Sequence, residues 1–467
     1  MAVSKKSTII TVLAICFILG SAMPVILPKI HTWWMLKRPY EQNADELMTL
    51  IRQKRFKEVE TFIRYVDRKN IVTRDGFRYF RAILERWFFA SEVLEFNRPQ
   101  PVPQDLLPLL NQWIYDYPES EIPYIIRGVY HIERGWEIRS RRYSSEVNKK
   151  NMEAFHNLHL LAKDDLEKAY RINPLNPHSS RQLIRVQRAL NSKDSEAADR
   201  YFNHAIRNHP TFYWAYRAKL ENMMPKWGGD WKSMFHFAVG TVKNAPSKTL
   251  LPHILAYALE EAAARSPNKT KFLSQPKVWN SIERVYTQII ADYPESTFWK
   301  VCFARVAMNA GKEKLALKYL DLAENEDPHY YRMIELKMLY AEGHHNWTTE
   351  EKYACALVAA CPQYDRAYAG LGYAFLNMGK YKKAIDNYTR AIALTPGSFR
   401  WIGSRCFCYV QTHKYAEAIN DCTKAIEINK EYAYAYKERA EAYEKSGDAK
   451  ASMADRITYK TLMRNGE

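Results

Sequence analysis

The sequence is poor in glycine, with 16 glycines in 467 residues, which is about half of the usual fraction of roughly 7%. Few glycines leave few positions for tight turns and phosphate-cradling loops, so hairpin-rich β folds and glycine-rich nucleotide-binding folds are disfavoured. The common motifs of dinucleotide-binding proteins, P-loop proteins, serine hydrolases and zincins do not occur. Because no nucleophile, base and oxyanion pattern can be assigned, we expect no enzymatic activity and no cofactor.

Cysteine is scarce as well, and its spacing forms no pattern. Cys16 lies in an apolar amino-terminal run, and the other six are Cys302, Cys355, Cys361, Cys406, Cys408 and Cys422. These spacings match neither a disulfide framework nor a zinc motif. Cys406 and Cys408 stand two apart on a predicted helix and point to different faces, so we interpret them as core residues. Asn157 and Leu158, between His156 and His159, bring no carboxylate ligand, so we predict no metal site.

Acidic residues are too few to balance the basic ones. The chain has 69 Lys and Arg against 52 Asp and Glu, which gives a net charge of +17. A basic surface favours acidic partners. Because the excess is spread along the chain instead of forming a tail, we expect an acidic protein or peptide, and neither nucleic acid nor a small-molecule substrate. Hydrophobic residues make up 47% of the chain, enough for a large core.

No charged residue occurs between Lys6 and Lys29, and this run is long enough to cross a hydrocarbon layer of about 30 Å. The sequence therefore predicts one transmembrane helix and a single-pass protein of the cell (inner) membrane. The predicted segments are a tail at 1–7, an anchor at 8–28 and a juxtamembrane segment at 29–44.

The same run has an alternative interpretation as a cleaved signal peptide, with Gly20-Ser21-Ala22 as the cleavage site. Trp33-Trp34, followed by Lys37 and Arg38, resembles an interfacial belt and favours the uncleaved anchor. Basic residues on both flanks leave the orientation open. The signal-like layout favours a large domain outside the cytoplasm.

An internal repeat sets the predicted architecture. Prolines at 294, 328, 362 and 396 are equally spaced, at an interval of about 34 residues that is typical of one class of helix–turn–helix repeats. Residues 365–398 then carry a complete repeat signature, which consists of Tyr368, Leu371, Gly372, Phe375, Ala384, Tyr388, Ala391 and Pro396. This segment resembles the tetratricopeptide repeat (TPR) family. The resemblance implies an all-α fold, an α-solenoid of antiparallel helix pairs stacked into a superhelix.

The neighbouring registers match less completely. Residues 399–432 carry Arg405-Cys406 where the signature has Leu-Gly, and 433–466 depart from the signature in a polar second helix that would cap the array. We predict a TPR array with a C-terminal capping helix at 297–467. Before it we expect an irregular helical-repeat domain at 45–240 and a connecting helix pair at 241–296.

A second resemblance lies in the amino-terminal part. Gly135-Trp136-Glu137 and Pro225-Lys226-Trp227-Gly228-Gly229 are similar to motifs of a bacterial family of helical domains of unknown function. We interpret Trp227-Gly228-Gly229 as a helix-ending turn, with a binding loop as the alternative.

In the TPR family the first helix of each repeat lines a concave groove, and the resemblance implies which residues meet a partner. The predicted groove residues are Arg366, Tyr373, Leu376, Arg400, Phe407, Gln411, Tyr434 and Lys437, with Val410 beside them. Ala369 and Gly403 stand where chaperone-binding members place polar clamp residues, so that clamp is largely absent. An aromatic floor edged by arginine suits an extended or helical peptide with an acidic residue. The alternative is that these aromatic residues only pack the solenoid.

These features together predict a membrane-anchored scaffold or adaptor that binds a protein partner through TPR grooves. An immunity or inhibitor protein that neutralises a toxin in the cell envelope is the alternative, because helical repeats provide large inhibitory surfaces.

Overall fold

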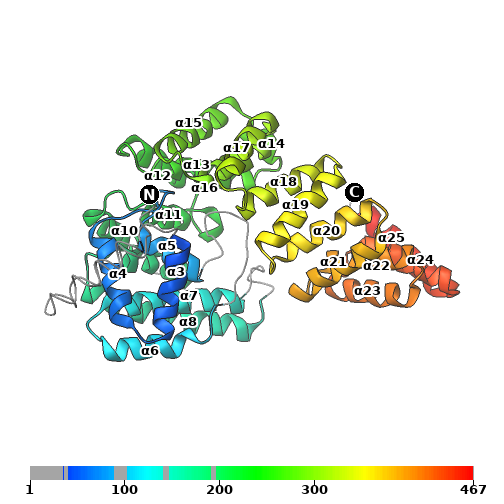
Figure 1. Cartoon of the computed structure of the whole chain (residues 1–467), viewed down its shortest axis with the longest axis horizontal. Helices are drawn as coiled ribbons and strands as arrows, with labels where there is room; N and C mark the ends of the chain where they lie inside the picture. The colour runs from blue at the N-terminus through cyan, green and yellow to red at the C-terminus, as the bar shows by residue number, and fades with distance from the viewer. Residues whose placement is uncertain (1–34, 36–39, 89–101, 140–146, 191–195, 466–467) are drawn as a thin grey trace, which may run out of the picture. The chain divides into compact units, whose positions relative to one another are not determined.

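The computed structural model describes residues 35, 40–88, 102–139, 147–190 and 196–465. These residues form helices throughout, apart from turns and one isolated antiparallel bridge between Val72 and Arg78 (Figure 1). The prediction of an all-helical, TPR-like fold is confirmed for this part of the chain. The predicted anchor at 8–28 lies outside it. Within the described ranges, none of the helices combines the length and the apolar character needed to cross a membrane.

The chain divides into two compact units. The first extends to Trp299 and includes Asn309–Gly311, and the second contains Lys300–Met308 and the residues from Lys312 onward. The helices before the division are α3 (Tyr40–Arg52), α4 (Phe56–Arg68), α5 (Tyr79–Phe88), α6 (Leu106–Asp116), α7 (Glu121–Arg139), α8 (Lys149–Ile172), α9 (Pro177–Ala189), α10 (Ala197–Asn208), α11 (Tyr213–Asn222), α12 (Trp231–Lys243), α13 (His253–Ala264), α14 (Lys269–Leu273) and α15 (Pro276–Asp292).

The core of the first unit begins with amphipathic helices. On α4, Phe56, Val59, Phe62, Ile63 and Val66 recur at helical spacing and are all buried, so one face of the helix packs inward. This face belongs to a continuous apolar cluster that extends through α7. The helical spacing of apolar side chains is therefore the local cause of this part of the fold.

Helices α7 and α8 run side by side as a long pair (Figure 1). A Cβ atom at Gly128 would lie 2.7 Å from the Leu166 side chain, so the pair can approach this closely because residue 128 has no side chain. Farther along α7, Trp136 meets Trp227 with ring centroids 6.2 Å apart. Trp227 ends a short 3-10 helix, Pro225–Trp227, and Gly228 follows with φ of 88°. The interpretation of Trp227-Gly228-Gly229 as a turn is confirmed.

The helices of the array keep the period of the prolines. First helices start at residues 297, 331, 365, 399 and 433, and second helices at 313, 347, 381, 415 and 449, each one proline period after the last. The bounds are α16 (Thr297–Asn309), α17 (Glu313–Glu326), α18 (Tyr331–Gly343), α19 (Trp347–Ala360), α20 (Asp365–Asn377), α21 (Tyr381–Leu394), α22 (Phe399–Gln411), α23 (Tyr415–Ile428), α24 (Ala433–Ser446) and α25 (Ala449–Asn465).

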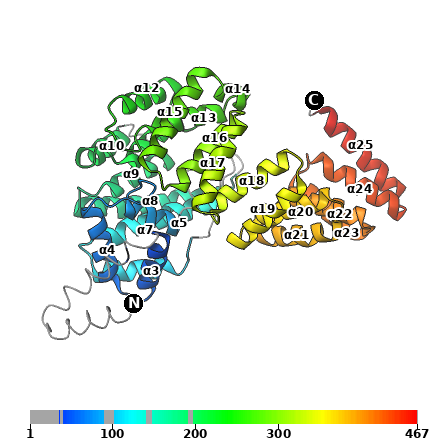
Figure 2. The ribbon, with the colours of Figure 1, turned by 45° about the horizontal axis from the view of Figure 1, so that its top comes forward.

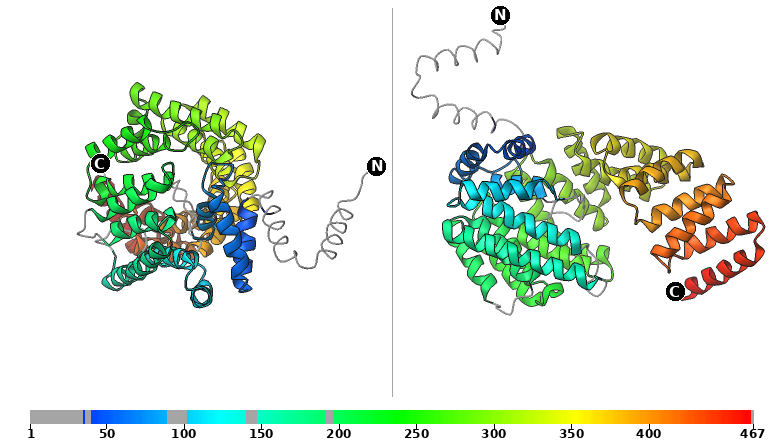
Figure 3. Two further views of the ribbon diagram at one scale, coloured as in Figure 1. Left: turned by 90° about the vertical axis from the view of Figure 1, so that its left-hand side faces the viewer. Right: turned by 90° about the horizontal axis from the view of Figure 1, so that it is seen from below.

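From α18 onward, successive antiparallel pairs stack on one another, as Figure 2 and the right-hand view of Figure 3 show in yellow to red. In the signature repeat α20 and α21 meet where Gly372 faces Tyr388, and a Cβ at residue 372 would lie 3.0 Å from the tyrosine ring. Tyr388 is fully enclosed, with 2% of its surface exposed. Because Gly372 has no side chain, α20 leaves room for the large ring of Tyr388 on α21.

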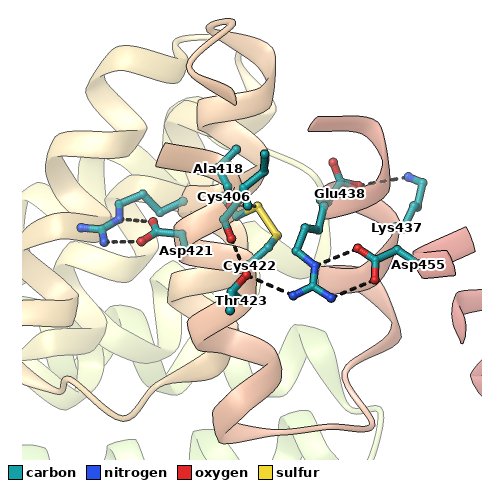
Figure 4. The surroundings of a disulfide bond; sticks show 11 residues. Cys406, Ala418, Asp421, Cys422, Thr423, Lys437, Glu438 and Asp455 are labelled. Carbon is teal, nitrogen blue, oxygen red and sulfur yellow. Dashed lines mark hydrogen bonds and ion pairs between the residues drawn. A yellow bond between two sulfur atoms is a disulfide. The ribbon is translucent and has the colours of Figure 1, made fainter. Parts of the chain in front are cut away.

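The next repeat replaces this contact by a covalent bond. The two equivalent positions, one proline period later, are Cys406 on α22 and Cys422 on α23, which form a disulfide with Cα atoms 5.6 Å apart (Figure 4). The cysteine spacings matched no disulfide framework, so this pair was not predicted. Spacing alone did not reveal the bond, because the separation of these two cysteines has meaning only once two facing helices are paired. Cys408 is buried and free, in agreement with its interpretation as a core residue.

Arg405, which replaces the signature leucine, has a polar role of its own. Its guanidinium donates to both carboxylate oxygens of Asp421, at 2.7 and 2.9 Å, and to the Thr389 hydroxyl of the preceding repeat at 3.0 Å. Arg439 repeats this arrangement one period later with Asp455 and Thr423. Figure 4 shows both carboxylates, Asp421 and Asp455, each facing its arginine. The arginine links two helices of one repeat to the repeat before it.

The last helix, α25, is less polar than predicted for a cap. Met453, Ile457 and Met463 expose 62%, 56% and 49% of their surfaces. At the position equivalent to Met453 in the preceding repeat, Ile419 is half-buried and packs against an apolar cluster. The exposure on α25 therefore results from its terminal place in the described array.

Candidate protein-binding face

The eight predicted groove residues lie on three successive first helices, and we call them the predicted binding face. Arg366, Tyr373, Arg400 and Lys437 are exposed, whereas Leu376, Phe407, Gln411 and Tyr434 are half-buried. Each is thus at least partly open to solvent. Val410, which we expected beside them, is 3% exposed. That expectation is wrong, because Val410 points into the apolar cluster of its own repeat.

Aromatic rings connect two of these helices. Phe407 on α22 and Tyr434 on α24 have ring centroids 6.3 Å apart, and the Lys437 Nζ lies 5.7 Å from the centre of the Tyr434 ring. Tyr381, the first residue of α21, also packs against Phe407, with ring centroids 6.1 Å apart. The structure therefore brings Phe407, Tyr434 and Lys437 together.

Tyr373 forms a second ring pair, with Trp347 at 5.8 Å and nearly perpendicular. Neither Trp347 nor Tyr381 was among the predicted residues. Both start a second helix, and Tyr415 starts the next one. An aromatic residue at this register of three successive repeats was the signal in the sequence that could have identified them.

Two of the predicted cations stand next to buried carboxylates of the protein itself. Arg366 Nη1 lies 3.5 Å from Glu335, which is fully buried and accepts a hydrogen bond from the Tyr364 hydroxyl. Lys437 Nζ lies 3.3 Å from the carboxylate of Glu438, which is 1% exposed. Burial raises the pKa of both Glu335 and Glu438. The charges of Arg366 and Lys437 are therefore partly compensated within the chain.

Arg400 has a different environment. Its guanidinium carbon lies 5.7 Å from the centre of the Phe399 ring, and Phe399 in turn packs against Tyr432 at 4.9 Å. Among the described residues no carboxylate lies within 4 Å of Arg400. An exposed guanidinium on an aromatic base can donate to an incoming carboxylate. Arg400 is therefore the cation of the predicted binding face that remains open to an acidic ligand.

On α8, the buried His159 imidazole contacts the backbone of its own helix. Burial lowers the pKa of His159 to about 4, and its Nδ1 lies 2.8 Å from the Phe155 carbonyl oxygen. In the described part of the chain, no three His, Cys, Asp or Glu side chains are grouped closely enough to hold a metal ion.

Two family models match the chain. The tetratricopeptide repeat model matches residues 365–398, the segment with the complete signature. The model of the domain of unknown function DUF4034 matches residues 43–156. This second match includes Trp136 and ends before Trp227, so it covers the first part of the domain predicted at 45–240.

The similar curated proteins match short segments. Mitochondrial import receptor subunit TOM70 of Mus musculus is 33% identical over 120 residues, which is 24% of this chain and 18% of TOM70. Serine/threonine-protein phosphatase 5 of Mus musculus is 36% identical over 84 residues, 18% of this chain and 16% of the phosphatase. The chain thus spans less than a fifth of the length of these relatives.

Among solved structures, the crystal structure of YrrB, a TPR protein with an unusual peptide-binding site, is 14% identical. The matched region covers 38% of this chain and 91% of the YrrB chain, with a TM-score of 0.36. By the two family matches, this chain contains a tetratricopeptide repeat in its carboxyl-terminal part and a domain of unknown function, DUF4034, in its amino-terminal part.

Proposed function

We propose that this protein is a scaffold that binds a partner protein through the predicted binding face of its TPR array. The observation that carries the proposal is Arg400, an exposed cation beside linked aromatic rings that meets no carboxylate of the described chain at contact distance. A tetratricopeptide repeat is present in the chain, and stacked repeats form extended surfaces for protein recognition.

The partner we propose is a peptide segment with an acidic side chain followed by apolar or aromatic groups. Arg400 would receive the carboxylate, and Phe407 and Tyr434 would pack against the apolar groups. Exposed aromatic and arginine side chains are enriched among the residues that carry binding energy at protein interfaces. Tyr373 and Trp347 would extend the contact toward the preceding repeat.

We further propose that residues 8–28 anchor the protein in the cell membrane with the array outside the cytoplasm. The disulfide between Cys406 and Cys422 supports this placement, because disulfides persist in oxidising compartments and are rare in the cytosol. Protease treatment of spheroplasts tests it. External protease should cleave the array, and an array protected until the cells are lysed would refute the orientation.

Crosslinking and affinity capture from membranes tests the binding face. The full-length protein is compared with Arg400→Ala and Tyr373→Ala, and Arg390→Ala serves as the matched control because Arg390 is an exposed arginine on the second helix α21. We expect the two variants of the face to lose a partner that the control retains. Recovery of the same proteins by all four would refute the proposal. A captured toxin would identify the protein as an inhibitor and not a general scaffold.

A further inference from the structure

The first unit contains a polar cleft of about 370 Å³. It lies between α4, the start of α7 and the turns that precede α9 and α11, and we define it by Arg64, Asp67, Arg68, Arg78, Asn176 and His209. At about 30 Å³ per water molecule, the cleft has room for about twelve waters, or for one side chain with its peptide groups. Four of the six residues belong to the segment matched by the domain of unknown function.

The first cation of the polar cleft is already neutralised. Arg64 lies 3.0 Å from Glu121 and 3.4 Å from Glu60, and it also donates to the Ser120 hydroxyl. Its donors are occupied by the chain itself, so Arg64 forms part of the wall.

Arg78 is held by neutral groups. Its guanidinium donates to the Asn70 side-chain oxygen and to His209 Nδ1, the latter at 2.9 Å. Because guanidinium groups only donate, Nδ1 of His209 must accept, and its Nε2 then donates to the Leu175 carbonyl oxygen at 3.0 Å. The imidazole is therefore neutral. In the described ranges, no carboxylate lies within 4 Å of Arg78.

This charge is also partly desolvated. Burial lowers the pKa of Arg78, and the nearby charge of Asp67 opposes this effect. A partly buried cation without a paired anion is unfavourable, and an incoming carboxylate would relieve it. Arg68, an exposed neighbour on α4, lines the same cleft and provides a second guanidinium.

Asp67 meets no lysine or arginine at contact distance among the residues that the structure describes. Its Oδ1 lies 3.6 Å from Nε2 of His178, an imidazole that is 2% exposed and whose Nε2 makes no hydrogen bond with any described residue. Burial lowers the pKa of His178, so the ring is neutral near pH 7. The polar cleft thus presents open donors on Arg78 and Arg68 and an open acceptor on Asp67.

We propose that the polar cleft binds a carboxylate-bearing peptide group, with Arg78 and Arg68 contacting the carboxylate and Asp67 accepting an N–H group of the same ligand. Asp67 and Glu121 both line the cleft. These two carboxylates repel a phosphate dianion more strongly than a singly charged carboxylate, so the cleft favours the carboxylate. The site is separate from the predicted binding face and does not depend on it. It assigns a ligand class to the domain of unknown function.

Equilibrium dialysis of the full-length protein tests the proposal. The probe is the pentapeptide Ala-Ala-Glu-Ala-Ala with both ends blocked, and the comparisons are the same peptide with Gln and inorganic phosphate. We expect the Glu peptide to saturate one site per chain and the Gln peptide to bind at least tenfold more weakly. No saturable binding below about 10 mM, where the binding free energy is under about 3 kcal/mol, would overturn the proposal. Phosphate binding as tight as that of the Glu peptide would also overturn it.

Variants locate the bound peptide. Arg68→Ala removes an exposed side chain, so folding is preserved, and it should weaken the Glu peptide at least fivefold. Arg78→Lys keeps the charge but loses the bidentate fork, and it should weaken the peptide as well. Arg200→Ala, an exposed arginine on α10, is the matched control and should change nothing. If Arg400→Ala abolished binding while Arg68→Ala had no effect, the peptide would be on the predicted binding face and the polar cleft proposal would be wrong.

Discussion

Glu350, on α19, is a carboxyl group enclosed in the TPR array. Its side chain is fully buried, and neither carboxyl oxygen has a hydrogen-bond partner among the described residues. One period later the equivalent residue is Ala384, the small residue of the complete signature. Burial, together with the charge of Glu342, raises the pKa of Glu350 from 4.5 to about 8. We predict that Glu350→Gln stabilises the repeat above pH 5.

The pH dependence follows from proton binding. The unfolded chain releases this proton near pH 4.5 and the folded chain releases it near pH 8, so stability falls as the pH rises between these values. The difference between these two pKa values limits the loss in the free energy of unfolding to about 5 kcal/mol above pH 8 and about 3 kcal/mol at pH 7. A glutamine at this position would carry no charge at any pH, and the two proteins should differ by less than about 0.5 kcal/mol near pH 4.5.

Hydrogen exchange of the α18 and α19 amides measures this difference locally, which suits a repeat protein that need not unfold as one unit. Wild type and Glu350→Gln are compared at the same pH, so that the intrinsic exchange rates cancel. We expect equal protection near pH 4.5 and at least tenfold slower exchange in the variant at pH 7.5. Glu351→Gln, a partly exposed neighbour, is the control and should show no such trend. Equal protection of wild type and Glu350→Gln at pH 7.5 would refute the reasoning.

Three further predictions concern the same array. Cys422→Ser, which removes the cross-link between α22 and α23, should lower stability by about 3 kcal/mol, measured by denaturant unfolding followed by circular dichroism. Reductant should destabilise wild type but leave the variant unchanged, and an equal response of both would contradict the role of the disulfide. Arg439→Leu breaks a bidentate pair with Asp455 and should cost about 2 kcal/mol, whereas a loss no greater than that of the exposed-site variant Arg390→Ala would contradict this. Gly372→Val places a side chain against the Tyr388 ring and should cost about 1–3 kcal/mol, and an unchanged unfolding midpoint would show that the two helices can separate freely.

The period of the prolines was sufficient to place the helices of the array. Helix starts follow it even at Tyr331 and Ala433, where the signature is incomplete, because helix length and turn geometry are local properties. The predicted binding face came from the resemblance to the TPR family, applied to this register. Neither the period nor the resemblance could show that Val410 is buried or that Glu335 lies beside Arg366, because these outcomes depend on which helix packs against each side chain.

The amino-terminal unit was predicted less completely. Some of its helices, such as α4, are amphipathic, and there the spacing of the apolar side chains indicates which face is buried. The polar cleft, however, joins Asp67, Arg78 and His209, which lie far apart along the chain and belong to no motif. Their chemistry depends on their position together in a partly buried cleft, where the described residues provide few opposite charges to compensate them.

The sequence by itself determined the helical class, the repeat period and the register of the signature residues, because these depend on the spacing of apolar and small side chains along the chain. Tertiary structure decided the pairings between helices, Cys406 with Cys422 and Arg405 with Asp421. It also decided that, within the described ranges, neither Arg78 nor Glu350 forms an ion pair at contact distance. Whether two side chains pair, or a charged side chain stays unpaired, depends on distance and burial. Both are fixed only when the helices pack.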